Sequence, residues 1–228
     1  EMRDCEERYP LKFKHVWLGS TSSGQGQILN PNWFVRYDYA NIQKTINLCH
    51  GMVITADTAF KTQDVNDYSV LQCWGYNIDL QQCYLLDTIR QKLAFPDLVH
   101  ASVKFWNDWS SRGYCVFPEK FLIEDKASGT SLVQTLRDKL SPHYVEPWLP
   151  SWYNYPNDKV SRANLTSVMM ERGCFYVPTN NSVSWANCFV NECADFEAES
   201  EGFDDQVDAY TMAASYFRRK GGDKVIGY

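Results

Sequence analysis

The amino-acid sequence predicts a mixed α/β fold whose sheet begins with three antiparallel strands and is flanked by helices. Three β-rich runs follow one another between residues 50 and 86 and are joined by short polar links, which is the pattern of an antiparallel meander. From residue 95 onward, segments with helical periodicity alternate with short apolar runs. That alternation is typical of strands connected by helical crossovers.

Length and composition are those of a folded globular protein. The chain has 228 residues, of which 44 % are hydrophobic and 22 % charged, so a disordered or collagen-like chain is excluded. It contains no run of about 18 apolar residues, and we therefore expect no membrane span. The net charge of −6 means that the overall field does not attract nucleic acid, so any such binding needs a local basic surface or bound cations.

Eight cysteines and four histidines are scattered along the chain without a CxxC pair. The cysteine content is below that of a disulfide scaffold, and the spacings do not match a zinc site. We expect mostly reduced thiols in a cytosolic compartment.

The elements in the first half are expected as follows. Residues 1–48 read as an irregular segment, and strands are predicted over 52–56, 68–74 and through 83–86 because these runs are rich in β-branched and aromatic residues. A helix with one buried face is predicted over 95–109 from its apolar spacing. A fourth strand follows, formed by residues 116–117 and 121–123 and ending at Glu124 and Asp125.

The second half begins with a helix over 128–140 and a short strand over 145–149. Asp158 is a typical N-cap and Gly173 a typical stop for the helix between them. A strand over 175–177 and helices over 186–197 and 205–220 complete the pattern. This order of elements is that of the ribonuclease-H-like fold.

Carboxylates stand at three places where an apolar element ends or begins. They are Asp57 after the first strand, Glu124 and Asp125 after the fourth, and Asp204, Asp205 and Asp208 at the last helix. Ligands tend to bind at strand ends in open α/β sheets, and converging carboxylates need a cation between them. Mg²⁺ or Mn²⁺ suits an all-oxygen site, and two such ions can drive phosphodiester hydrolysis. A metal-dependent nuclease is the leading hypothesis, against turn, capping and surface roles for each carboxylate.

Four segments resemble the nuclease motifs of large terminase subunits from tailed bacteriophages. Residues 53–59 with 66–70 resemble the first motif, 122–130 the second, and 158–163 and 204–209 two later motifs. The resemblance implies a ribonuclease-H-like endonuclease domain that cuts concatemeric double-stranded viral DNA with two divalent ions and little sequence specificity.

The same resemblance implies a domain organisation and a set of partners. It implies a linker segment at 1–48 coming from a missing ATPase domain, a nuclease domain at 49–220 and a mobile tail at 221–228. The chain has no GxxxxGK[ST] motif, so it should not hydrolyse ATP itself. Expected partners are double-stranded DNA, a portal protein and a small terminase subunit, in the host-cell cytoplasm and without a membrane.

Carried over by position, Asp57 is implied as a catalytic metal ligand. Glu124 and Asp125 compete for the second role, because only one of two neighbours on a strand faces the site, and Glu124 is preferred. Asp205 is the preferred third ligand, with Asp208 as a further metal ligand on the same helical face.

Auxiliary roles are expected for Asp67 and Asp204. Contacts to DNA phosphates are expected from Lys126, Lys159 and Arg162, of which the last two stand at a helix start. The family often has a histidine before the paired aspartates, where this sequence has Phe203. The alternatives are another ribonuclease-H-like phosphoryl transferase, such as a junction resolvase or transposase core, and a non-enzymatic module that docks on a portal or small terminase subunit.

Overall fold

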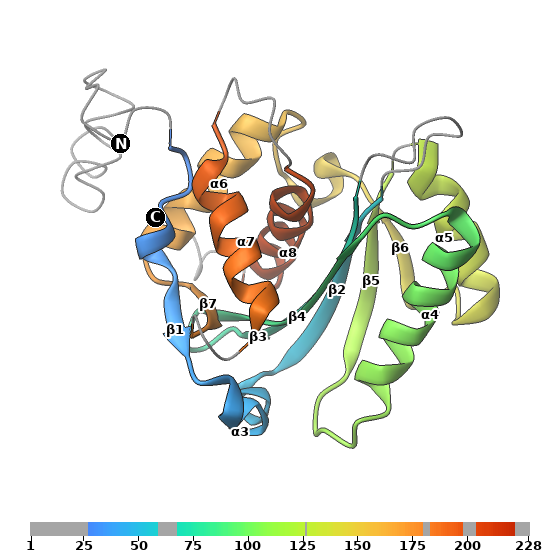
Figure 1. The fold of residues 1–228 in the computed structure, drawn as a ribbon, viewed down its shortest axis with the longest axis horizontal. Helices are drawn as coiled ribbons and strands as arrows, with labels where there is room; N and C mark the ends of the chain where they lie inside the picture. The colour runs from blue at the N-terminus through green and yellow to red at the C-terminus, as the bar shows by residue number, and fades with distance from the viewer. Residues whose placement is uncertain (1–26, 59–67, 126, 180–182, 198–203, 222–228) are drawn as a thin grey trace.

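The fold is built on one seven-stranded mixed sheet (Figure 1). A computed structural model describes residues 27–58, 68–125, 127–179, 183–197 and 204–221. The order of strands across the sheet is β1-β7-β4-β3-β2-β5-β6. Their bounds are β1 Val35–Tyr37, β2 Gly51–Asp57, β3 Ser69–Asn77, β4 Gln82–Gln91, β5 Pro118–Glu124, β6 Val145–Trp148 and β7 Phe175–Pro178. The meander β2-β3-β4 is antiparallel and every other pairing is parallel, so the predicted fold class is confirmed.

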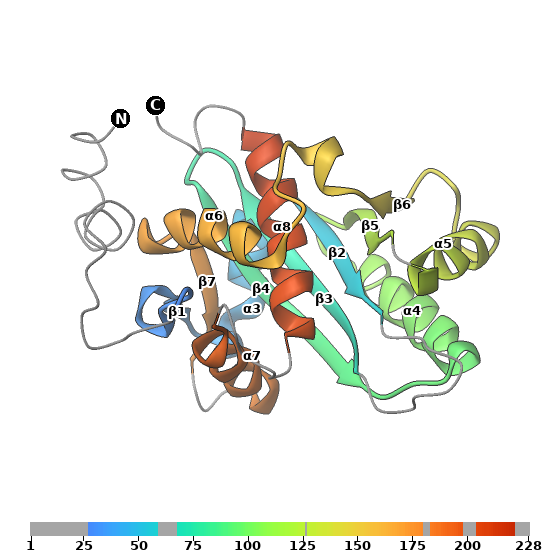
Figure 2. The ribbon, with the colours of Figure 1, turned by 90° about the horizontal axis from the view of Figure 1, so that it is seen from above.

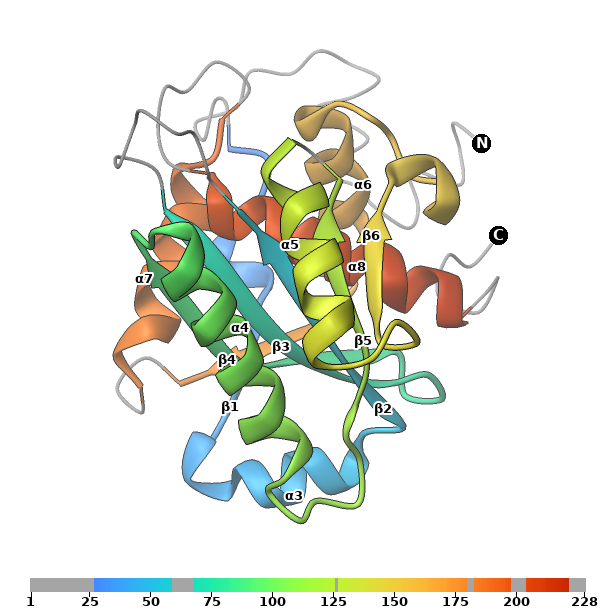
Figure 3. The ribbon, with the colours of Figure 1, turned by 90° about the vertical axis from the view of Figure 1, so that its right-hand side faces the viewer.

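Helices cover both faces of this sheet. The α-helices are α3 Ile42–Leu48, α4 Phe95–Ser110, α5 Ala127–Lys139, α6 Lys159–Glu171, α7 Ser184–Asp195 and α8 Asp205–Gly221, and short 3₁₀ turns are η1 Pro31–Trp33, η2 Tyr39–Asn41 and η3 Pro150–Tyr153. Helix α8 lies across one face with α6 and α7 beside it (Figure 2). Helices α4 and α5 cover the opposite face (Figure 3).

Two hydrophobic cores follow from this three-layer arrangement. Val53 of β2 packs in the core beneath α8, whereas its neighbours Met52 and Ile54 pack in the core beneath α4 and α5. Adjacent strand residues point to opposite faces, so a strand covered on both sides must be apolar throughout. All seven residues of β2 are buried accordingly.

Residues 27–48 differ from the expectation of an irregular segment. They contain β1, which pairs in parallel with β7, and the helix α3. A three-residue strand is too short to show a period-2 pattern, and its partner lies about 140 residues further along the chain. The predicted domain boundaries stay a prediction, and the predicted mobile tail beyond Gly221 lies outside the described residues.

Every strand except β3 runs in the same direction, so six of the seven strands end at the same edge of the sheet. Strands β2 and β5 are parallel, and β2 and β4 are both antiparallel to β3. The carboxyl ends of β2, β4 and β5 therefore lie along one edge. Helix α6 begins with the predicted cap, in which Asp158 accepts a hydrogen bond of 2.8 Å from the backbone N–H of Ser161.

The helices in the described ranges are all too short or too polar to cross a lipid bilayer. Every cysteine within these ranges is a free thiol, and the reduced state expected from the sequence stays a prediction.

Candidate metal centre

Three carboxylates that are far apart in the sequence meet at the carboxyl edge of the sheet. Asp57, Glu124 and Asp208 each place an oxygen within 4.8 Å of the other two. All three are buried, with at most 9 % of each residue exposed. They come from the end of β2, the end of β5 and the first turns of α8.

The two strands bring the first two carboxylates together. Ala56 of β2 is the register partner of Ile123 of β5, so Asp57 and Glu124 leave the sheet side by side. Gly129 lets α5 begin close to this point, because a Cβ at residue 129 would collide with the carbonyl oxygen of Glu124. Any larger residue at 129 would displace the end of β5 or the start of α5.

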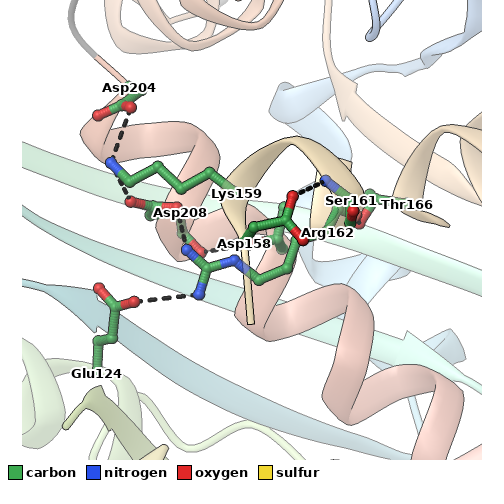
Figure 4. A network of polar contacts seen from close by, with 9 residues as sticks. Glu124, Asp158, Lys159, Ser161, Arg162, Thr166, Asp204 and Asp208 are labelled. Atoms are coloured by element: carbon green, nitrogen blue, oxygen red, sulfur yellow. Dashed lines mark hydrogen bonds and ion pairs between the residues drawn. The ribbon is translucent and has the colours of Figure 1, made fainter. Parts of the chain in front are cut away.

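Helix α6 supplies two cations to the same cluster (Figure 4). Arg162 Nη1 contacts Glu124 Oε1 at 3.1 Å, and its Nη2 contacts Asp208 Oδ1 at 2.8 Å. Lys159 Nζ lies 2.7 Å from Asp208 Oδ2 and 2.8 Å from Asp204 Oδ2. Through these contacts, helix α6 links Glu124 at the end of β5 to Asp204, just before α8, and to Asp208 in the first turn of α8.

The Arg162 side chain is an internal group. The residue is 2 % exposed, and its guanidinium carbon lies 5.2 Å from the centre of the Trp148 ring. Arginine tolerates such sites because its planar fork can bond two carboxylates while it stacks on an aromatic face. The structure thus places Arg162 inside the fold, and its predicted contact to DNA stays a prediction.

Burial and charge act in opposite directions in the cluster. Burial raises the pKa of Asp208, and Arg162 and Lys159 only partly offset that rise. Burial also disfavours the charged form of Lys159, but the carboxylates of Asp208 and Asp204 outweigh it and raise the pKa of Lys159. When all groups are ionised, three carboxylates face two bases, so the centre keeps a negative charge that attracts a cation.

Asp125 and Asp205 lie outside the carboxylate group. Asp125 is exposed and accepts a hydrogen bond of 2.9 Å from the hydroxyl of Thr130 in the first turn of α5. Neighbouring strand residues point to opposite sides, so Asp125 points away from the site when Glu124 points into it. Asp205 is instead close to Glu192, and burial together with Glu192 and Asp204 raises its pKa to about 6.

Helical geometry explains why Asp208 and Asp205 separate. At about 3.6 residues per turn, a residue three positions earlier lies about 60° from Asp208 in one rotational direction, and a residue four positions earlier lies about 40° from it in the opposite direction. Lys159 contacts Asp204 and Asp208, which are four apart, and Asp205 projects from a different side. The structure therefore places Asp208 but not Asp205 in the converging group, and the metal-ligand role of Asp205 stays a prediction.

Two expected residues lie outside the described residues, namely Asp67 and Lys126, and so does Phe203. Lys159, expected to contact DNA, is partly exposed at the rim of the cluster. Sequence reasoning missed the internal role of Arg162, although its place one turn after a capped helix start is a usable signal.

The donor set fits a hard divalent cation. The group consists only of carboxylate oxygens, which Mg²⁺ and Mn²⁺ prefer over the thiolate and imidazole donors that zinc favours. Carboxylates in a buried, net negative site gain most from such an ion because its charge offsets their mutual repulsion.

Comparisons with known proteins agree with this architecture. The nuclease domain of the human cytomegalovirus terminase, in a crystal soaked with Mn and bound to an inhibitor, is 12 % identical, covers 82 % of this chain and 93 % of its own, and has a TM-score of 0.55. The P22 large terminase nuclease domain is 16 % identical over 73 % of this chain and 81 % of its own, with a TM-score of 0.52. The nuclease domain of the bacteriophage SPP1 large terminase, with bound Mn, is 10 % identical over 76 % and 90 %, with a TM-score of 0.51. These likenesses are of fold.

A search of curated proteins finds no match. Residues 54–217, however, match the family model described as the terminase RNaseH-like domain. The match covers most of the chain and includes Asp57, Glu124 and Asp208. The chain therefore belongs to the family of terminase RNaseH-like domains, as its motifs indicated.

Proposed function

We propose that this chain is a divalent-metal-dependent endonuclease that cuts concatemeric double-stranded viral DNA during genome packaging, with little sequence specificity. The observation that carries the proposal is the buried group of Asp57, Glu124 and Asp208 at the carboxyl edge of the sheet. Membership of the terminase family supports DNA packaging as the setting. The Mn-containing nuclease domains of similar fold support a divalent ion.

Asp57, Glu124 and Asp208 would hold Mg²⁺ or Mn²⁺, and we propose two ions. Bound divalent ions in such a site activate a water for attack on phosphorus and stabilise the leaving oxygen. The protein need not supply a nucleophile of its own. Its residues hold the carboxylates in place, and Arg162 does this by bonding Glu124 and Asp208 at once.

Lys159 gives the site a cation at its rim. Its ammonium group contacts Asp204 and Asp208 and is partly exposed, so it can meet a phosphate that approaches the carboxylates. Because 22 basic residues face 28 acidic ones and leave the chain at −6, we expect weak and salt-sensitive DNA binding. Affinity should fall steeply between about 50 and 200 mM salt, as counterion release requires.

The remaining expectations are proposals that follow from family membership. They are an ATPase domain in the full-length chain, a portal protein and a small terminase subunit as partners, and the host-cell cytoplasm as the location. A junction resolvase or a purely docking role is less favoured, since neither is implied by a terminase family match.

Cleavage of supercoiled plasmid tests the proposal. The protein is incubated with plasmid in Mn²⁺, in Mg²⁺ and in EDTA, and nicked and linear products are measured. We expect cutting with either metal, none in EDTA, and none with Asp57→Asn. Asp79→Asn is the matched control, because Asp79 is an exposed carboxylate on the turn between β3 and β4.

Two results would contradict the proposal. One is cutting that continues in EDTA, and the other is cutting by Asp57→Asn at the rate of Asp79→Asn. A four-way junction cut far faster than the same sequence as linear duplex would instead favour a resolvase.

A further inference from the structure

A cavity lies on the other side of α8 from the carboxylate group. It has a volume of about 340 Å³ and is formed between the end of β4 and the start of α7. Its lining includes Thr88, Ile89, Arg90, Trp185, Cys188 and Gln206. The volume lies within the roughly 300–1,000 Å³ range of small-molecule sites.

Two buried polar atoms on residues of this lining lack a hydrogen-bond partner among the described residues. They are the Thr88 hydroxyl and the Gln206 side-chain oxygen, in residues that are 7 % and 1 % exposed. Buried polar atoms are nearly always satisfied in folded proteins. Two such atoms on the lining of one cavity therefore indicate that a ligand supplies their missing hydrogen bonds.

The orientation of Gln206 is held by its other contacts. Its Nε2 donates to Glu192 Oε2 and its backbone N–H donates to Glu192 Oε1, both at 2.7 Å. Its backbone carbonyl accepts from Gln72 Nε2 at 3.2 Å. Because Nε2 is committed to Glu192, the side-chain oxygen is left as an acceptor, and the ligand must supply a donor.

The rest of the lining favours a flat, uncharged group over a phosphate. Trp185 contributes an aromatic surface. The nearest cation, Arg90, is paired with Glu192 at 3.2 Å. A phosphate beside Arg90 would also be repelled by the Glu192 carboxylate, whereas an uncharged ring would not be repelled.

The cavity lies on the same sheet edge as the carboxylate group. Thr88 is near the carboxyl end of β4, and Asp57 ends β2. One strand, β3, separates them, so at the usual strand spacing they are about 10 Å apart across the sheet. Gln206 also stands two residues before Asp208 on α8. A DNA strand along this edge would pass both places.

We propose that this cavity binds one unpaired nucleobase of the DNA strand that enters the carboxylate group. A thymine or guanine edge carries an N–H beside a carbonyl, so the N–H donates to the Gln206 oxygen and the carbonyl accepts from the Thr88 hydroxyl. The ring lies against Trp185, as bases do on aromatic side chains in single-strand binding proteins. This inference rests on DNA being the substrate, which is part of the proposed function.

The test measures binding of a fluorescent ten-nucleotide thymidine strand by anisotropy in EDTA, where no cutting occurs. Trp185→Leu should weaken binding about 5- to 150-fold, the range for losing one stacked base. Thr88→Val should weaken it about fivefold without lowering the melting temperature, because the hydroxyl has no partner to lose. Phe117→Leu is the control, since Phe117 is an exposed aromatic just before β5, at the opposite edge of the sheet.

Cysteine labelling gives a second readout in the same samples. Cys188 lines the cavity and is exposed, and exposed Cys115 serves as the internal control. The thymidine strand should slow alkylation of Cys188 and leave Cys115 unchanged in peptide mass spectra. Thymidine monophosphate at equal nucleotide concentration should protect less, because a strand adds contacts along the sheet edge.

The inference would be overturned if Trp185→Leu and Thr88→Val bound the strand as tightly as wild type. It would also be overturned if Cys188 were alkylated equally fast with and without the strand. Equal protection by the monophosphate would also overturn it, by assigning the cavity to a free nucleotide. The assays need no metal, so their outcome is independent of plasmid cleavage. Failure of cleavage with intact Cys188 protection would count against the proposed function alone.

Discussion

The two sides of the first turns of α8 carry carboxylates in opposite circumstances. On one side, Asp208 is bonded to both Arg162 and Lys159 and lies beside Glu124. On the other side, Asp205 has two acidic neighbours, Glu192 and Asp204, and its pKa rises to about 6. The residues are three positions apart and burial raises the pKa of both, but at Asp208 two bonded bases oppose that rise, whereas at Asp205 two acidic neighbours add to it.

The difference shows that the elements packed around a helix decide what its carboxylates can do. Helix α6 presents two basic side chains to the Asp208 side, and α7 presents Glu192 to the Asp205 side. A metal ion would be drawn to the first side, where three oxygens already converge.

Catalysis should show the largest contrast. Asp208→Asn removes one ligand of the proposed metal site, which costs several kcal/mol of charge stabilisation, so we expect the cleavage rate to fall about 10³-fold. Asp205→Asn should stay within about tenfold of wild type. Initial rates of plasmid cutting in Mn²⁺ measure both, and equal losses would make Asp205 a ligand after all.

Removing Arg162 should lower the free energy of unfolding more than breaking an exposed ion pair does. Arg162→Met leaves Glu124 and Asp208 buried without their shared partner, for which we expect a loss of about 3–5 kcal/mol in the free energy of unfolding. Lys104→Met, which breaks an exposed pair with Asp108, should cost about 0.5 kcal/mol or less. Urea unfolding without metal compares them, and similar losses would mean that the Arg162 bridge contributes little.

Metal should stabilise the fold through the Asp208 side only. At 100 times its dissociation constant, Mn²⁺ should add about 2.7 kcal/mol to wild type. Asp205→Asn should keep this gain, while Asp208→Asn and Glu124→Gln should lose most of it. Thermal unfolding across a Mn²⁺ titration measures the gain, and its loss in Asp205→Asn would place the ion on the other side of α8.

The pH dependence of stability should carry a smaller signature of Asp205. Its pKa rises from an ordinary value of 3.8 in the unfolded chain to about 6 in the fold. Between these values the folded state holds the proton more often, so this group makes stability fall as the pH rises from about 4 to 6. Asp205→Asn should flatten that decline and raise the melting temperature at pH 7, and melting curves from pH 4 to 8 provide the check. An unchanged pH profile would show that Glu192 and Asp204 do not act on Asp205 as described.

Much of this architecture could be predicted from local patterns. The meander of β2 to β4, the cap at Asp158 and the strand end at Glu124 all have signals within a few residues, since propensity and capping act locally. The short strand β1 could not be predicted, because its stability comes from pairing with the distant β7. The motif resemblance pointed to the right family, which the family match confirms.

The sequence by itself determined that acidic residues stand at strand ends and at the start of the last helix. Only the tertiary structure decided which of them meet. The rotation of α8 about its axis and the docking of α6 bring Asp208 rather than Asp205 to Asp57 and Glu124, and turn Arg162 inward. Such rotations depend on how whole helices bury their apolar sides against the sheet, and no single motif encodes them.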